Sequence, residues 1–177
     1  MLRVRLRASG RAAHSSFPEL GESAIDKLLD ALVALRSIEL PSDPALGHTH
    51  YTVGLISGGV AANVVSPFAE AEAMFRTVGD ADDVRRAIAP LERQVAIEHL
   101  LEVPPVRMTT VPGFVAAAFP YSTDVPFLSN WGDPLLFGPG SIHAAHTADE
   151  FVEVTELRSA VDAYVTIARA LLGRLSS

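Results

Sequence analysis

The six histidines are the side chains of this chain best suited to metal binding or acid–base chemistry, and their neighbours distinguish them. His146 follows the turn-forming segment GPG at 138–140 and precedes Asp149 and Glu150. A neutral imidazole in such a place can ligate a metal ion or act as a general base, and a solvent-facing loop histidine is the alternative. His143 lies three residues earlier. Two histidines without a third ligand are a weak indication of a metal site.

The remaining histidines have different surroundings. His14 lies in the segment GRAAHSSFP at 10–18, directly after an alternating N-terminal segment, so it is expected to project from the end of a sheet. His48 and His50 are expected at the polar entry to a strand, and His99 is expected to be a structural residue within another strand.

Two other polar side chains are candidates for ligand binding. Asn63 follows the segment GGVAA at 58–62, where it can bind a ligand or hold its own loop through side-chain to backbone bonds. Arg76 ends an alternating segment on its polar face. Its planar guanidinium can bind a carboxylate bidentately, or pair on the surface with Glu70 or Glu72.

The hydrophobic pattern predicts the elements that position these residues. Alternation predicts strands near 2–6, 51–56, 69–78 and 96–103, and helical spacing predicts a helix over 22–37 and another that begins after Asp80. The order βαββαβ predicts an α+β, ferredoxin-like domain over 1–105, with an antiparallel sheet and both helices on one face. Beyond it, short strands are predicted at 108–118 and 134–137, and a helix at 154–172.

Composition narrows the possible functions. The chain has 177 residues and no cysteine, which excludes disulfides, thiolate zinc sites and cysteine nucleophiles. A net charge of −7, from 21 acidic and 14 basic residues, argues against nucleic acid or an anionic membrane as the partner. The N-terminus alternates instead of forming the apolar run of a signal peptide, and no apolar stretch is long enough to span a bilayer. We therefore expect a cytoplasmic protein.

Three motifs, in this order, resemble those of the di-zinc metallohydrolase family of acetylornithine deacetylase, succinyl-diaminopimelate desuccinylase and aminoacylase. Residues 10–25 are similar to its Gly-x-x-x-His-Ser-x-x-Pro-x-x-Gly-x-Ser-Ala-Ile signature. Residues 58–65, followed by Arg76 at a strand end, are similar to its Gly-Gly-x-x-x-Asn-Val-Val-Pro segment, with Ser66 where proline is usual. Residues 138–150 resemble its C-terminal metal-ligand motif.

The resemblance implies a role for each matching residue. His146 matches a zinc ligand, and His14 matches the histidine that reaches across the dimer to polarise the substrate carbonyl. Three residues match substrate-binding positions: Asn63, Arg76 and Gly138. The first domain would form a homodimer, and residues 106–177 would be the C-terminal remnant of the catalytic domain.

The family binds two zinc ions, and most of its ligands and its general-base glutamate precede the dimerisation domain. These residues are not expected in this chain, and one histidine cannot hold a catalytic zinc. The resemblance therefore implies the C-terminal portion of a zinc-dependent deacylase acting on N-acyl amino acids or small peptides, inactive and without stably bound zinc as an isolated chain. The alternative is a free-standing dimerisation or interaction module. An upstream reading frame with a His-x-Asp motif would favour a truncation, and a clean start with a ribosome-binding site would favour the module.

Overall fold

The computed structural model describes residues 1–44, 46–119 and 123–174. The chain divides into two compact units, one of residues 1–106 and 118–127 and one of residues 107–117 and 128–177. Each unit is described by itself below.

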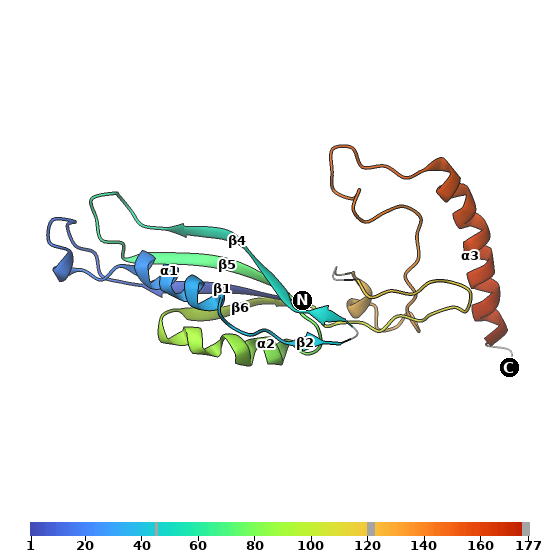
Figure 1. Ribbon diagram of the computed structural model, residues 1–177, viewed down its shortest axis with the longest axis horizontal. Coiled ribbons are helices and arrows are strands. Elements are labelled where there is room, and N and C mark those ends of the chain that lie inside the picture. The colour runs from blue at the N-terminus through green and yellow to red at the C-terminus, as the bar shows by residue number, and fades with distance from the viewer. Residues whose placement is uncertain (45, 120–122, 175–177) are drawn as a thin grey trace. The chain divides into compact units, whose positions relative to one another are not determined.

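The first unit contains a four-stranded antiparallel sheet. Its strands are β1 (Leu2–Ser9), β4 (His50–Gly58), β5 (Phe68–Arg76) and β6 (Ala96–Glu102), arranged in the order β4-β5-β1-β6 (Figure 1). This is the order of a ferredoxin-like βαββαβ domain, and the predicted fold class is confirmed. A short hairpin of β2 (Ser42–Asp43) and β3 (Gly47–His48) precedes β4, and the sequence pattern did not indicate it.

Two helices cover one face of this sheet. The Ser23 hydroxyl caps α1 (Ala24–Leu35) by accepting a hydrogen bond from the Asp26 amide. The Asp80 carboxylate caps α2 (Ala81–Ile88) by accepting one from the Asp82 amide. Three short 3-10 helices also belong to the described part of this unit: η1 (Pro18–Leu20), η2 (Ala89–Arg93) and η3 (Val125–Phe127).

The core lies between α1, α2 and the sheet. Alternate residues of β1 and β5 point into it, and those of β5 are mostly alanines, with Phe75 fully buried at one end. Small side chains let α1 approach β1 and β5 closely, and its Leu28 and Leu35 fill the space that remains. Burial of each such leucine contributes roughly 2 kcal/mol.

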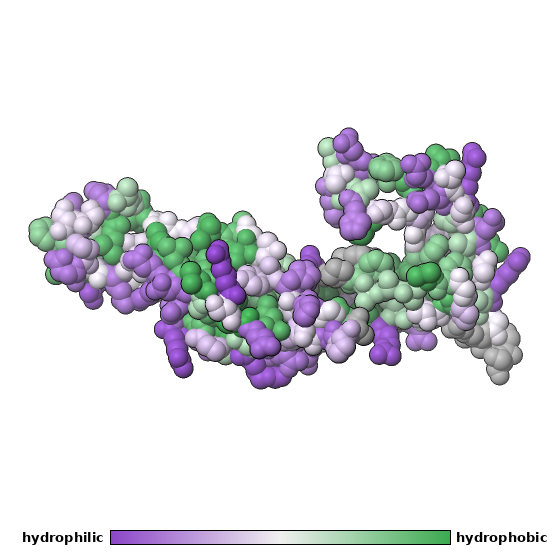
Figure 2. All heavy atoms as spheres, in the orientation of Figure 1, coloured by the Kyte–Doolittle hydropathy of each residue, from purple (hydrophilic) through white to green (hydrophobic). Residues whose placement is uncertain are grey.

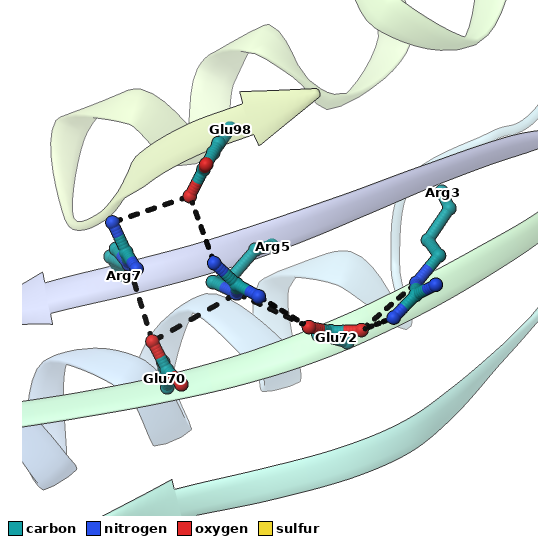
Figure 3. Close-up of polar contacts among 6 residues, drawn as sticks. All are labelled: Arg3, Arg5, Arg7, Glu70, Glu72 and Glu98. Carbon is teal, nitrogen blue, oxygen red and sulfur yellow. Dashed lines mark hydrogen bonds and ion pairs between the residues drawn. The ribbon is translucent and has the colours of Figure 1, made fainter. Parts of the chain in front are cut away.

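The opposite face of the sheet carries a network of six charged side chains: Arg3, Arg5, Arg7, Glu70, Glu72 and Glu98 (Figure 3). Glu72 is its centre, because its two carboxylate oxygens accept from Arg3 Nε at 2.9 Å and from Arg5 Nη2 at 2.8 Å. The hydrogen bond from Arg3, which has the larger effect, and that from Arg5 hold the pKa of the Glu72 carboxyl below its ordinary value. On this face of the sheet, charged side chains therefore pair with one another, whereas the other face packs apolar side chains against the helices.

The second unit contains α3 (Val154–Arg174) and segments of turns and irregular chain. The strands predicted at 108–118 and 134–137 are wrong, because the described residues of both segments form no strand. Prolines at 112 and 134 lack the amide that a ladder needs, and one backbone bond, from the Thr109 amide to the Pro134 carbonyl at 2.6 Å, joins the two segments. Across the part of the chain that the structure describes, no helix is both long and apolar enough to cross a membrane.

Three aromatic rings hold part of this second unit together. Phe137 meets Phe114 edge-on at 5.7 Å and Tyr164 edge-on at 5.2 Å, and the Tyr164 hydroxyl donates to the Phe137 carbonyl. The predicted final helix is confirmed. Much of its apolar surface is nevertheless exposed, as at Leu157, Val161 and Leu172.

Candidate functional site

His14 and Asn63 lie together on a two-stranded arm that extends beyond the ends of β1 and β4 (Figure 1). We call residues 10–22 and 59–67 the arm. Its two segments are joined by backbone hydrogen bonds from Ser15 N to Asn63 O and from Val65 N to Ala13 O, both of 2.9 Å. The structure therefore brings two residues that were both predicted to be functional, 49 apart in sequence, onto neighbouring segments of the arm, with His14 opposite Val64 and Asn63 next to it in the chain.

The base of the arm is closely packed. Gly10 donates to the Pro67 carbonyl at 2.8 Å, and a Cβ at Gly10 would lie only 2.0 Å from the Glu22 carbonyl oxygen. Arg11 and Glu22 exchange two backbone bonds of 2.9 Å, which close the loop that carries His14. Lys27 of α1 secures this junction, because its ammonium donates to the Ser9 carbonyl and pairs with the Glu22 carboxylate at 2.6 Å.

Ser66, the position at which this sequence departs from the expected proline, is part of the same junction. Its side chain is buried and donates to the Phe68 carbonyl at 2.7 Å, while its own carbonyl accepts from the Ala24 amide at 2.9 Å. The serine hydroxyl supplies a hydrogen bond that proline could not, so the segment after Asn63 is ordered by side-chain and backbone contacts together.

The ring of His14 is oriented by its own loop. The Ser16 amide donates to His14 Nδ1 at 3.1 Å, and among the described residues no other histidine ring makes a hydrogen bond. Because Nδ1 is the acceptor, the neutral ring carries its proton on Nε2. His14 is exposed, so Nε2–H is available to donate to an oxygen of a bound molecule.

Asn63 is also exposed on the arm, and its carbonyl is engaged by the Ser15 amide. Within the described residues its side-chain amide makes no hydrogen bond, so the alternative of an asparagine that holds its own loop through its side chain is not observed. Exposed apolar side chains share the arm with it: Phe17, Leu20 and Val60. The arm thus presents one imidazole and one amide among apolar groups.

Arg76 lies at the opposite end of the sheet from the arm. The arm continues from the Phe68 end of β5 and Arg76 ends that strand, which separates them by roughly 26 Å at ~3.3 Å per residue. Its guanidinium is near Met1 Sδ, at 3.3 Å, and its strand partner is His50. The predicted alternative of a pair with Glu70 or Glu72 is not what the network shows, since Arg3, Arg5 and Arg7 hold those carboxylates (Figure 3).

His146 and Gly138 belong to the second unit. His146 has a φ of 63°, in the left-handed region, and its amide donates to Glu150 Oε2 at 2.9 Å. Both His146 and Gly138 are exposed, and a Cβ at Gly138 would meet no atom within 4 Å. The strained backbone of His146 is held by its acidic neighbour, and its ring faces solvent.

The residues present do not by themselves form a zinc site. Within residues 1–44, 46–119 and 123–174, no three histidine, aspartate or glutamate side chains are grouped so that they could hold a metal ion. A catalytic zinc takes about three protein ligands, and His146 supplies one.

Sequence reasoning missed two contributors to the arm. The Ser16 amide is a backbone donor, so the type of residue at position 16 does not indicate its role. Lys27 is the only lysine of the chain, and its place four residues after the helix cap could have indicated a link to the preceding loop.

Comparison with known proteins places the first unit in a class of peptidase dimerisation domains. The family described as "Peptidase dimerisation domain" matches residues 1–99. The chain belongs to the M20 family of peptidases and amidohydrolases.

The chain is similar to a peptidase M20 domain-containing protein of Schizosaccharomyces pombe, at 34% identity over 92% of this chain and 42% of that protein. It is also similar to an Aspergillus niger protein named as a carboxypeptidase, at 36% identity over 98% of this chain and 47% of that protein. Among solved structures, aminopeptidase PepT from Bacillus cereus shares the fold, with a TM-score of 0.62, 19% identity, and coverage of 89% of this chain and 48% of that one. The chain thus spans less than half the length of these relatives.

Proposed function

We propose that this chain supplies the dimerisation domain and one metal-ligand segment of a hydrolase that cleaves the amide bond of an N-acyl amino acid or a small peptide. Membership of the M20 family supports the hydrolase class. The observation that carries the proposal is the arm, which holds His14 against the segment that contains Asn63, with the Nε2–H of His14 available to donate. That donor suits the carbonyl oxygen of a scissile amide, on which negative charge develops during hydrolysis.

In this proposal, the arm and Arg76 of one subunit belong to two different substrate sites. A small substrate spans far less than the roughly 26 Å of β5 that separates the arm from Arg76. In our proposal, the arm and Arg76 of the same subunit therefore contact different substrate molecules. Arg76 is suited to a substrate carboxylate through its planar guanidinium.

This division supports a homodimer through the first unit, in which each arm reaches the site of the other subunit. Zinc, with His146 as one ligand, belongs to the intact protein in this proposal, because the described residues of this chain lack the other ligands. We infer that the isolated chain has no hydrolase activity and binds zinc weakly.

The test is an assay of the purified chain, with and without zinc, on N-acetylornithine and on other N-acyl amino acids and dipeptides. We expect no turnover above that of the buffer. Turnover should appear only when the chain is joined to the part of a relative that this chain does not cover, and should then be lost in His14→Ala. A zinc-dependent rate of the isolated chain that His146→Ala abolishes would contradict the proposal.

A free-standing dimerisation module is the second candidate, favoured by the absence of a grouped metal-ligand set among the described residues. The joined protein distinguishes the two. A module would dimerise as well as the hydrolase does, yet its His14→Ala variant would lose no activity, because there would be none to lose.

A further inference from the structure

A second polar side chain stands directly across the sheet from Arg76. Arg76 ends β5, and its partner in the pairing of β4 with β5 is His50, the first residue of β4. The odd-numbered residues of β5 are buried against the helices, so Arg76 projects from the face that carries the charge network. Residues directly opposite each other in an antiparallel pair share a face, so His50 projects from that face as well. Tyr51, the next residue of β4, packs instead on the buried Phe75, with ring centroids 5.5 Å apart.

The two side chains are close enough to hold one small anion between them. The Cβ atoms of directly opposed residues in an antiparallel pair are about 4.5–5.5 Å apart. His50 is exposed and Arg76 is half-buried, so both are reached from solvent. Within the described residues the His50 ring makes no hydrogen bond, and Arg76 Nη1 lies 3.3 Å from Met1 Sδ. A guanidinium has several N–H donors, and an imidazole has at least one whether or not it is charged. An anion that binds Arg76 from solvent is therefore within reach of the imidazole.

The two strands that carry this pair place no acid beside it. The nine residues of β4 include no Asp or Glu, and Figure 2 shows hydrophobic surface over the same strand. On β5 the acid nearest in sequence to Arg76 is Glu72, four residues away, or about 13 Å along the strand. The Glu72 carboxylate is already held by Arg3 and Arg5. An incoming anion therefore meets two donors and no opposing carboxylate from β4 or from the neighbouring positions of β5.

A carboxylate is the anion that suits this arrangement and the proposed substrates. Its two oxygens together accept about four hydrogen bonds, and the planar guanidinium of Arg76 can make two of them side by side. An N–H of His50 can then donate to a remaining lone pair of one oxygen. Charge-assisted hydrogen bonds are about twice as strong as neutral ones, so a second donor raises affinity for the carboxylate over a neutral amide in the same position.

We propose that His50 is a substrate-binding residue, the second donor to the carboxylate that Arg76 binds. The favoured substrates are then molecules with a free carboxylate beside the scissile amide, such as N-acyl amino acids and dipeptides with an unblocked C-terminus. This inference rests on the role of Arg76 in the proposed function, and it adds a residue that determines specificity.

A binding titration of the whole chain tests the role of His50. The 15N-labelled chain is titrated at constant ionic strength with N-acetylglycine and, separately, with N-acetylglycinamide, in which a neutral amide replaces the carboxylate. The ring signals of His50 and the Nε–H signal of Arg76 report binding by NMR. We expect both to shift saturably with N-acetylglycine and neither to shift with the amide. His50→Leu should weaken binding about fivefold, and His50→Gln, which keeps an N–H donor, should weaken it less.

His48→Leu is the matched control, because His48 is also exposed and lies two residues earlier, on β3. It should bind N-acetylglycine as the unmodified chain does. Equal binding by His50→Leu would overturn the role of His50, and equal binding of the acid and the amide would overturn the subsite.

Turnover by the joined protein decides the proposed function separately from these titrations. In that protein, His50→Leu should raise KM for an N-acyl amino acid with little change in kcat. An unchanged KM would overturn the role of His50 while leaving the hydrolase in place. A joined protein without turnover would overturn the proposed function, whereas the titrations would still decide the carboxylate subsite.

Discussion

The Ser16 amide donates to Nδ1 of His14 across 3.1 Å, within a single turn of chain. The acceptor role of Nδ1 leaves Nε2 as the protonated nitrogen of the neutral ring, and the pairing of Ser15 with Asn63 holds that turn against the second strand of the arm. The ring is therefore oriented by its backbone, and a bound carbonyl would meet a donor whose direction is already set.

Nitrogen-detected NMR should show this tautomer directly. In the 15N-labelled chain at alkaline pH, where imidazoles are neutral, His14 should show a purely unprotonated Nδ1, with a scalar coupling across the hydrogen bond to the Ser16 amide. The other five histidines should show averaged ring shifts. Ser16→Ala keeps the amide and should leave the signature unchanged, while Ser16→Pro removes it. An averaged His14 ring in the unmodified chain would contradict the assignment.

Placing a charge on β4, an edge strand of the sheet at which we expect the homodimer contact, should separate the dimer. Ile56→Asp would put an unpaired carboxylate into the proposed contact, so we expect dimerisation to weaken at least about tenfold, or by ~1.4 kcal/mol. The control is Leu101→Asp, an exposed apolar residue on the other edge. Multi-angle light scattering across a concentration series measures both. Equal association constants for the two variants would place the contact elsewhere.

The charge network predicts a definite pH dependence of stability. Since Arg3 and Arg5 lower the pKa of Glu72, its carboxylate stabilises the fold above the ordinary carboxyl pKa of about 4.3, and this is lost as pH falls through the lowered value. Glu72→Gln should therefore melt earlier than the unmodified chain at neutral pH, with the difference shrinking in acid. Glu92→Gln, an exposed site on η2, should show no such convergence. Thermal melts followed by circular dichroism provide the comparison.

The base of the arm should not tolerate a single methyl group. Gly10→Ala would force a Cβ to within 2.0 Å of the Glu22 carbonyl, so backbone must move, at a cost of roughly 1–3 kcal/mol. We expect lower stability and faster hydrogen exchange at the Ser15 and Val65 amides. Gly138→Ala has open space around it and serves as the matched control. Unchanged exchange in Gly10→Ala would mean that the arm has more freedom than its contacts indicate.

Hydrogen exchange should also separate the two units. The exposed apolar side of α3 and the lack of strands in residues 107–117 and 128–153 leave little to protect their amides, so the second unit should exchange faster than β1 and β5. Joining the chain to the part of a relative that it does not cover should slow hydrogen exchange in α3 selectively. Equal protection of both units in a monomeric chain would contradict this prediction.

The sequence was most informative where a regular pattern coincides with burial. Alternation along β1 and β5 follows from one face meeting the helices and the other meeting water, so both strands and the ferredoxin-like order were predictable. The strands predicted in the second unit failed, because apolar residues among prolines imitate a strand pattern without supplying the backbone donors. The shift in the pairing of β4 with β5 between Val53 and Leu55 was equally hidden, since a bulge depends on the partner strand.

For the candidate site, residue types alone indicated His14 and Asn63 as candidates but could not show that their segments lie next to each other. Their proximity arises from the continuation of the β1 and β5 segments past the sheet, which brings residues 13–15 beside 63–65. The orientation of the His14 ring depends on a backbone amide, which no side-chain motif encodes.

The distance along β5 between the arm and Arg76 has a genetic consequence. If each catalytic centre takes His14 from one subunit and Arg76 from the other, a His14→Ala chain and an Arg76→Ala chain are each inactive alone. A mixed dimer of the two has one centre with both residues intact and one centre with neither. Two defective alleles of the intact protein would then restore each other in the same cell, with about a quarter of the centres active when subunits pair at random.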